Sequence, residues 1–211
     1  LVKSIAETID GGIVIGGYFS QDNIDLGNGI VLNKKSIGGY DDGMIVKYNS
    51  SGECEWARAI GGLDFDFAYS AIELSNGRYL AAGTFKKHTI YMENGVQLTY
   101  GAQNAEGFIV EFEKNETSSN VLTYGGKVIG GNKDDRITKM VSTSDGGYLV
   151  GGYFCSNIDL GNNIILKNSG NRQCGMIIKY NSNDEAEWAK VIGDYNTQVN
   201  TLVQLSDNSY I

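Results

Sequence analysis

The sequence predicts an all-β protein, namely an open segment of a β-propeller with about three four-stranded antiparallel blades and the start of a fourth. Three observations predict this fold. The 211 residues include 29 glycines and no proline, a composition that indicates many tight turns between short strands. Short apolar runs rich in Ile, Val, Tyr and Phe alternate with those turns, as strands do. Two motifs also recur along the chain in a fixed order, which is typical of propeller repeats.

The first motif contains two apolar runs around a turn such as Asp-Gly or Asn-Gly, and each complete copy ends on a phenylalanine. Turns of this kind are the usual connections of two-stranded hairpins. In the first repeat the motif predicts strands at Ser4–Thr8 and Ile13–Phe19. The copies cover residues 4–19, 70–85 and 139–154, and a partial copy runs from near Thr201 to Ile211.

The second motif alternates with the first and predicts two further strands per repeat, Met44–Tyr48 and Cys54–Ile60 in the first one. It begins with GMIVKYN and continues, after a polar turn, with EWARAIGG. The middle copy departs from this pattern, because it has no tryptophan and retains only the tail GKVIGG. The two parts of the motif lie at residues 43–49 and 55–62, at 107–113 and 126–131, and at 175–181 and 187–193.

The connection between the second and third strands of each repeat is long enough for an additional hairpin. In the first repeat it contains Asn23–Leu32, where Asn28-Gly29 lies between apolar residues. Asn-Gly in that setting is a strong hairpin signal. Residues 157–166 repeat the pattern closely and residues 89–98 loosely, so we expect an extra hairpin on every blade. Residues 1–211 form a single propeller region in this interpretation, with repeats at about 1–67, 68–135 and 136–197 and a partial repeat at 198–211.

These motifs resemble the bacterial β-propeller repeat family often called SBBP. Its members are similar to this chain in a glycine-rich second strand, a third strand like DGMIVKYNSSGE (residues 42–53) and a fourth like EWARAIGG (residues 55–62). The similarity covers essentially the whole chain and concerns the fold, not an activity. It implies a large secreted or surface-exposed bacterial protein. The second repeat departs most from the family pattern, since it lacks the tryptophan and the Lys-Tyr-Asn end of the third strand.

Charge and hydropathy argue against two classes of partner. The formal net charge is −8 and Lys and Arg form no cluster, so the chain repels phosphates and we expect no nucleic-acid binding. The apolar runs are too short to span a bilayer, so we expect no membrane insertion. No signal peptide is visible, but the chain opens at Leu1 inside a repeat, and we expect its true N-terminus to lie further upstream.

Cysteine and histidine indicate little chemistry. Cys54, Cys155 and Cys174 show no CxxC spacing, so they predict neither a disulfide framework nor a zinc site. A local disulfide between Cys155 and Cys174 is an open alternative. His88 is the one histidine, which disfavours a His-based metal site or a catalytic triad, and we interpret it as a solvated loop residue. We predict no cofactor.

Six aspartates are the candidate binding residues. They occur in the Ile-Asp-Leu-Gly-Asn hairpins or in the connections between repeats. Carboxylates in glycine-rich loops could bind Ca²⁺, but no loop offers the six to eight oxygens that Ca²⁺ requires. Aspartate also caps turns by accepting nearby backbone N–H groups, which we favour here, so we expect no metal requirement for folding. The six residues are Asp25 and Asp159 in the hairpins, and Asp64, Asp66, Asp134 and Asp135 between the repeats.

We predict a noncatalytic binding or architectural module, not an enzyme. A catalytic pair of acids would interrupt the repeat, whereas these acids occupy equivalent positions in it. Trp56 and Trp188 could stack on sugars, but their repeated strand position favours packing between blades. The alternative is a carbohydrate-binding or carbohydrate-active protein that uses the face with the extra hairpins.

We expect an extracellular or cell-surface protein that binds a protein or glycan ligand on its loop face. If the first strand of each repeat is innermost, the hairpins and most of the aspartates share that face, and loops on a rigid scaffold commonly carry binding sites. Three blades cannot close a ring, since propellers have four to eight. We therefore expect neighbouring blades from a longer chain or from another copy. The apolar residues at the C-terminal end that would contact them are Leu202, Val203, Leu205 and Ile211.

The alignment of the repeats makes two structural predictions. Val46, Val110 and Ile178 should be buried at equivalent strand positions, because sheets stacked face to face bury both sides. The second glycine of the pair in each second strand is present in all three repeats, so we expect a close backbone approach there.

Overall fold

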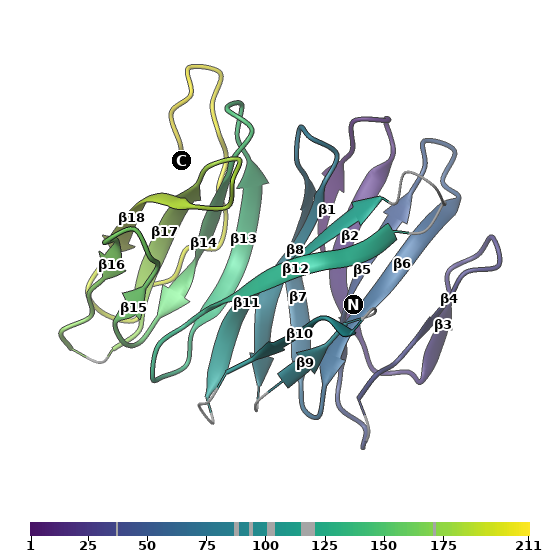
Figure 1. The fold of residues 1–211 in the computed structure, drawn as a ribbon, viewed down its shortest axis with the longest axis horizontal. Coiled ribbons are helices and arrows are strands. Elements are labelled where there is room, and N and C mark those ends of the chain that lie inside the picture. Colours follow the sequence, from purple (N-terminus) through teal and green to yellow (C-terminus); the bar gives the residue numbers. More distant parts are fainter. Residues whose placement is uncertain (37, 87–88, 93–94, 101–103, 115–120, 171) are drawn as a thin grey trace.

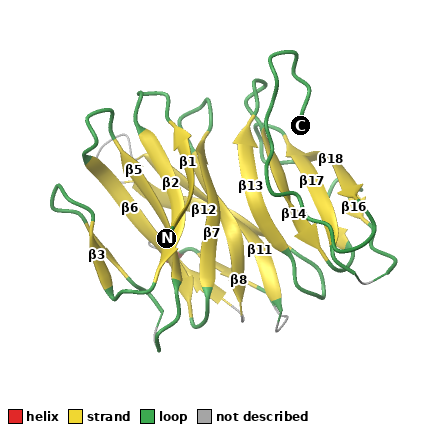
Figure 2. Ribbon diagram, turned by 180° about the vertical axis from the view of Figure 1, so that it is seen from behind, coloured by secondary structure: helices red, strands yellow, loops and turns green. Residues whose placement is uncertain are grey.

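The computed structural model of the chain consists of antiparallel β-sheets, without a helix among the residues it describes (Figures 1 and 2). This confirms the predicted all-β fold class. No described segment forms a helix long and apolar enough to cross a membrane. His88 lies outside the described residues. The structure describes residues 1–36, 38–86, 89–92, 95–100, 104–114, 121–170 and 172–211.

Twelve long strands form three four-stranded units, and in each unit every strand pairs with the next one along the chain. The predicted strand ends of the first repeat agree with the structure to within two residues. The first sheet contains β1 (Val2–Glu7), β2 (Ile13–Phe19), β5 (Asp42–Tyr48) and β6 (Cys54–Gly62). The second contains β7 (Asp66–Glu73), β8 (Tyr79–Lys86), β11 (Ala105–Lys114) and β12 (Val121–Ile129). The third contains β13 (Arg136–Ser142), β14 (Tyr148–Phe154), β17 (Cys174–Tyr180) and β18 (Ala186–Ile192).

The predicted additional hairpins are present between the second and third strand of each sheet. One of them also joins two sheets, because β9 pairs with the end of β6 through Gly61 and Gly62 and extends the first sheet to six strands. The turn residue Asn28 has a φ of 55°, a conformation that asparagine tolerates better than most residues. The hairpins are β3 (Asn23–Asp25) with β4 (Val31–Asn33), β9 (Thr89–Tyr91) with β10 (Gln97–Thr99), and β15 (Ile158–Asp159) with β16 (Ile165–Leu166).

The three sheets pack face to face, with β7 against β1 and β2, and β13 against β7 and β8. In Figure 1 the turns within each sheet lie at the upper edge, and the hairpins and the connections between sheets lie at the lower edge. The prediction that Val46, Val110 and Ile178 are buried is confirmed, with exposed fractions of 2%, 0% and 0%. Each sheet therefore contributes to the apolar core on both of its faces.

Trp56 packs between the first and second sheets, as predicted for the repeated tryptophan. Its ring centroid lies 5.0 Å from that of Tyr79 and 6.3 Å from that of Phe112, both in the second sheet. Trp188 occupies the same pairing position in the third sheet, opposite Lys179 as Trp56 is opposite Lys47. Trp188 is half-buried and contacts Tyr210, at a ring distance of 6.1 Å.

The retained glycine of each second strand faces a bulge in the neighbouring first strand, as the pairing register shows for all three sheets. A methyl group on Gly17, Gly83 or Gly152 would overlap a backbone carbonyl oxygen at this point. This confirms the predicted close backbone approach, which only glycine permits.

We expect Gly152→Ala to destabilise the protein by about 3 kcal/mol, because its methyl group would collide with the rigid carbonyl of Arg136. The neighbouring variant Gly151→Ala is the matched control. Its methyl group would meet the side-chain ends of Val199 and Leu202 at 2.8 and 2.9 Å, which can move, and the second sheet already has Ala82 at this position. Urea unfolding of both variants tests this, and equal losses of stability would contradict the bulge argument.

Candidate functional site

The hairpin aspartates Asp25 and Asp159 cap the turns in which they lie. Their side chains are exposed, and each accepts a hydrogen bond from a backbone N–H two residues later, Gly27 at 2.9 Å and Gly161 at 3.0 Å. This is the turn capping that we favoured over a calcium site. The structure does not bring the two residues together, because their hairpins are separate two-stranded sheets, one following β2 of the first sheet and the other following β14 of the third.

The aspartates that follow the Gly-Gly pairs take different roles. Asp64 is buried and accepts the N–H of Phe65 at 2.8 Å. Asp134 is exposed and accepts the N–H of Ala105 at 2.9 Å, which ties the start of β11 to the connection before β13. Both therefore hold loop backbone in place at the lower edge of the sheets.

Asp66 and Asp135 close the junctions between consecutive sheets. Each accepts a backbone N–H from the end of the preceding sheet at 2.7 Å, from Gly62 and Gly131 respectively. Both side chains are fully buried. Each also lies near a second buried acid at the start of a third strand, Asp42 beside Asp66 and Glu106 beside Asp135. The sequence analysis did not identify Asp42 and Glu106 as partners. The feature that could have predicted them is an acid directly before the glycine of the third strand.

The pair of Glu106 and Asp135 lies at the second junction, and both side chains are buried. Neither carboxyl oxygen of Glu106 has a hydrogen-bond partner among the described residues, and its side chain is only 1% exposed. A methyl group on Gly130 would overlap Glu106 Oε2 and lie 3.3 Å from Asp135 Oδ2, so both acids meet over this glycine. Burial, and secondly the charge of Asp135, raise the pKa of Glu106 to about 9.

The pair of Asp42 and Asp66 repeats this arrangement at the first junction. Burial raises the pKa of Asp66 to about 8, and the neighbouring Asp42 carboxylate acts in the same direction. Asp42 instead accepts backbone N–H groups from Lys35 and Ser36. Because these acids are closed off from solvent, they can hold protons but cannot reach a substrate.

At the junction after the third sheet, the two places taken by acids at the other junctions are held by residues without a carboxyl group. Cys174 stands where Asp42 and Glu106 stand in the other sheets, as the pairing with Phe154 shows. Thr197 replaces the aspartate; its Oγ1 accepts the N–H of Gly175 at 2.9 Å and donates to the carbonyl of Ile192 at 2.7 Å. A neutral hydroxyl can therefore close such a junction.

Charged side chains join the strands at the opposite edge. In the first sheet the buried ammonium of Lys47 binds Asp10 and Glu55, each at 2.9 Å. Lys179 does the same in the third sheet with Asp145 and Glu187. The second sheet has the opposite charge at this pairing position, where Glu111 stands opposite Gly125.

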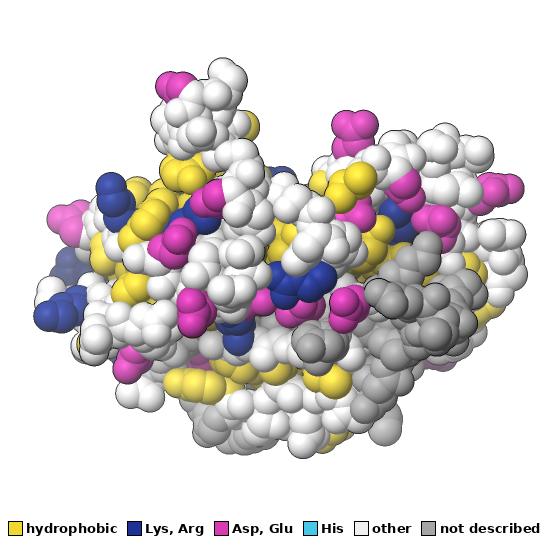
Figure 3. Space-filling view, turned by 45° about the horizontal axis from the view of Figure 1, so that its top comes forward, with side chains coloured by type: hydrophobic (Ala, Val, Ile, Leu, Met, Phe, Trp, Pro, Cys, Tyr) yellow, Lys and Arg dark blue, Asp and Glu magenta, His cyan; other side chains and the backbone are white. Residues whose placement is uncertain are grey.

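In the second sheet, Arg78 supplies the positive charge from the adjacent turn. It binds Glu111 and reaches across to Asp184 of the third sheet, with Nη1 2.7 Å from Asp184 Oδ2. The loss of the tryptophan in the second repeat thus accompanies a reversed ion pair that crosses the sheet boundary. Figure 3 shows acidic and basic side chains interspersed on this side of the molecule, without a patch of one sign among the described residues.

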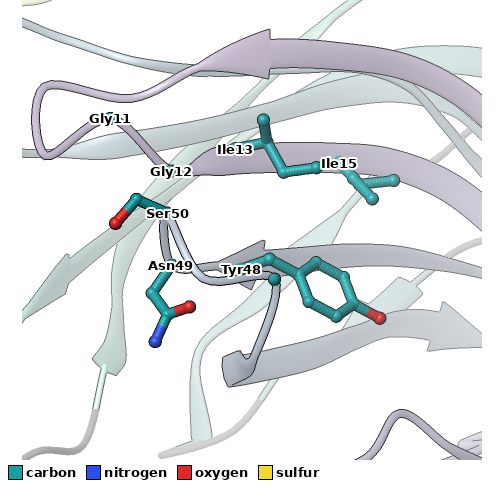
Figure 4. Close-up of a pocket in the computed structure, with 8 residues that line it drawn as sticks. Gly11, Gly12, Ile13, Ile15, Tyr48, Asn49 and Ser50 are labelled. Carbon is teal, nitrogen blue, oxygen red and sulfur yellow. The ribbon is translucent and has the colours of Figure 1, made fainter.

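The outer face of the first sheet carries a shallow apolar depression of about 480 Å³ (Figure 4). Ile13 and Ile15 of β2 and Tyr48 at the end of β5 supply its apolar side chains, and the adjacent turns form the rim. The corresponding residues of the other two sheets are buried by the preceding sheet. In the second sheet they are Tyr79, Ala81 and Phe112, and in the third Tyr148, Val150 and Tyr180.

A second surface feature is a group of aromatic rings around β7, which sequence reasoning also missed. Phe65, Phe67 and Tyr69 alternate along the chain, and consecutive rings are 6.1 and 5.9 Å apart. Tyr18 packs edge-on against Phe67 at 4.6 Å, and the guanidinium of Arg136 lies 5.2 Å from the Tyr69 ring. Phe65 is 40% exposed. The alternating Phe-x-Phe-x-Tyr pattern of residues 65–69 is the sequence feature that could have predicted this group of rings.

Other predicted chemistry is corrected or limited by the structure. All three cysteines are free thiols in this structure, which does not contain the Cys155–Cys174 disulfide left open by the sequence. Within the described ranges, no three His, Cys, Asp or Glu side chains are grouped so as to hold a metal ion.

No protein-family model matches the chain, and no curated protein is significantly similar to it.

Proposed function

We propose that this chain is a noncatalytic architectural and binding module, part of a β-propeller in a secreted or cell-surface protein. Three four-stranded antiparallel sheets packed in chain order support the propeller interpretation. The resemblance of the motifs to SBBP repeats supports the bacterial, extracellular setting. In this interpretation the chain holds further sheets and binding loops in place, and the acids are structural.

One observation carries the proposal: the first sheet exposes the positions that its neighbours bury. Ile5 is 59% exposed, whereas the corresponding Ala71 and Met140 are 1% and 0% exposed. Ile13, Ile15 and Tyr48 form an open depression at positions that are covered in the other sheets. A sheet face of this kind is suited to contact another sheet of the same design.

An extended chain tests this proposal. A second copy of residues 136–197 placed directly before Leu1 would keep the natural spacing. The pair of Glu7 and Ile13 matches the pair of Gln204 and Tyr210, so Leu1 would take the place of residue 198. We expect the extended protein to melt several degrees higher than the original at low concentration, since the added sheet covers the free apolar face.

Ile5→Lys supplies the control for the extended chain. The substitution should have little effect in the original chain, where the side chain is exposed, and should remove the gain in the extended one by burying a charge. An extended protein that melts no higher than the original, or is indifferent to Ile5→Lys, would contradict the proposal.

Carbohydrate binding is the second candidate function, favoured by the aromatic rings around β7. Partly exposed Phe65 beside Phe67 and Tyr69 offers apolar ring surface of the kind on which sugars stack. These rings belong to β7 and to the connection before it, not to the additional hairpins that the sequence suggested. Trp56 does not take part, because it is buried between sheets. A glycan-array screen of the chain, repeated with Phe65→Ala, separates this function from a purely architectural one.

A further inference from the structure

We propose that a second copy of this chain packs head to tail on the free face of the first sheet, through its C-terminal hairpin, residues 199–211. The inference rests on the proposed architectural function and names the partner. The two ends of the chain present the two halves of a contact that already exists inside the molecule. In Figures 1 and 3 this hairpin projects from the body of the protein.

The C-terminal hairpin has the form of the first two strands of a sheet. Gln204 pairs with Tyr210, as Glu73 pairs with Tyr79 in the second sheet. One side of the hairpin packs on the third sheet, where Leu202 is buried against Gly151. This corrects the prediction that Leu202 is part of the apolar end surface.

The other side of the hairpin is apolar and uncovered. Val203, Leu205 and Ile211 are 47%, 37% and 71% exposed. At the matching places of the second sheet stand Ile72, Leu74 and Leu80, which are 5%, 0% and 1% exposed because they pack on the third sheet. The hairpin therefore presents the same chemistry as a buried contact surface, without the sheet that would cover it.

The first sheet presents the matching half. Inside the molecule, the cluster of Ile72, Leu74 and Leu80 contains Met140, Tyr148 and Val150 of the next sheet. The places of those three residues are taken in the first sheet by Ile5, Ile13 and Ile15, which lie on its free face. Joining the two ends would thus bury isoleucine, leucine and valine side chains in one contact.

Polar groups at the two ends also match an internal pattern. At two sheet boundaries a turn N–H donates to a side chain of the next sheet: Ile9 to Glu73 at 2.7 Å and Ser144 to Gln204 at 2.8 Å. The corresponding groups at the ends are the N–H of Ser206 and the side chain of Glu7. Both residues are exposed or partly exposed and would complete the same bond between copies.

A second bond recurs in the same way. Ser4 Oγ accepts the N–H of Ala71, and Ser70 Oγ accepts the N–H of Met140, both at 2.9 Å. Thr201 holds the corresponding hydroxyl in the hairpin, and the N–H of Ile5 is the corresponding donor in the first sheet. Two copies joined at both ends would contribute three sheets and one hairpin each. These fill eight places around the axis, the upper end of the four to eight blades of closed propellers.

Sedimentation velocity on the unmodified chain tests the contact. We expect a species heavier than the 22.9 kDa monomer whose fraction rises with concentration. Ile5→Lys and Ile211→Asp should each weaken the association by about tenfold or more, because each buries a charge in the contact. Both side chains are exposed in the single chain, so its fold should not change. Ile165→Asp, at a 50% exposed residue of β16, is the matched control and should associate normally.

Mixing the two variants gives a sharper result. One contact in the mixed pair is unaltered, and the other brings the introduced lysine of Ile5→Lys close to the introduced aspartate of Ile211→Asp. The mixture should therefore associate more strongly than either variant alone.

Three outcomes separate this contact from the proposed function. A chain that stays monomeric up to about 100 µM, where even a weak contact is populated, would overturn the inference. So would an association that only Ile165→Asp abolishes. An extended chain that melts higher while the original stays monomeric would retain the proposed function and reject this contact.

Discussion

Raising the pH from about 5 to about 9 should lower the free energy of unfolding, by up to about 1.4 kcal/mol per pH unit for each buried acid that stays protonated in the folded protein. The physical reason is the pair of buried acids at each of two sheet junctions. Glu106 and Asp66 have pKa values raised to about 9 and about 8, chiefly by burial. In the unfolded chain both groups ionise near their ordinary values of about 4.

The sign follows from proton binding. Between about pH 4 and pH 9 the folded protein holds protons that the unfolded chain has released, so stability falls as the pH rises through this window. At low pH the dependence of stability on pH has the opposite sign, because stability falls as the pH is lowered. Although burial raises it, hydrogen bonds from Thr143 and Lys179 bring the pKa of Asp145 down to about 2, and its contribution is lost as the pH falls towards that value. Stability should therefore be greatest in mildly acidic solution.

Glu106→Gln and Asp66→Asn test the cause, because an amide imitates the neutral acid. At pH 8 both variants should be more stable than the unmodified protein, and the double variant should lose most of the alkaline decline. Asp159→Asn is the control, since this side chain is exposed and caps a turn. Thermal unfolding across the pH range provides the measurement. An unchanged slope in the double variant would show that other groups cause the decline.

Trp56→Ala should destabilise the protein by about 3–5 kcal/mol, the usual cost of removing a fully packed indole. The ring is 7% exposed and contacts Tyr79 and Phe112 across the sheet boundary. Its loss would leave a cavity between two rigid sheets, which cannot close around it.

Trp188→Ala is the matched variant at the same pairing position of the third sheet. This ring is half-buried and packs against Tyr210 of the C-terminal hairpin, so we expect a loss of about 1 kcal/mol. Urea unfolding of both variants at low protein concentration gives the comparison. Equal losses would mean that burial between sheets does not set the contribution of the repeated tryptophan.

The sequence by itself determined the elements of this fold. Period-two apolar runs, Asp-Gly and Asn-Gly turns and the recurring motifs predicted the strands to within two residues in the first repeat, together with the extra hairpins. They also predicted the burial of Val46, Val110 and Ile178 and the close approach at the retained glycine. These features depend on local backbone geometry and on neighbouring strands, which a repeated sequence displays directly.

Only the tertiary structure decided which groups meet across sheets. Asp42 and Asp66 are 24 positions apart in the printed sequence and Glu106 and Asp135 are 29 apart, and each pair meets because consecutive sheets bring a third strand and the next first strand together. The reversed ion pair of Arg78 and Asp184 likewise joins two sheets. Packing also decided which apolar residues at the C-terminal end stay uncovered: Ile211 is exposed, as expected for that end, whereas Leu202 is buried against the third sheet. Whether a side chain is buried, and which group it pairs with, depends on the sheet that packs against it. The sequence of one strand does not show which other strand lies across the sheet boundary.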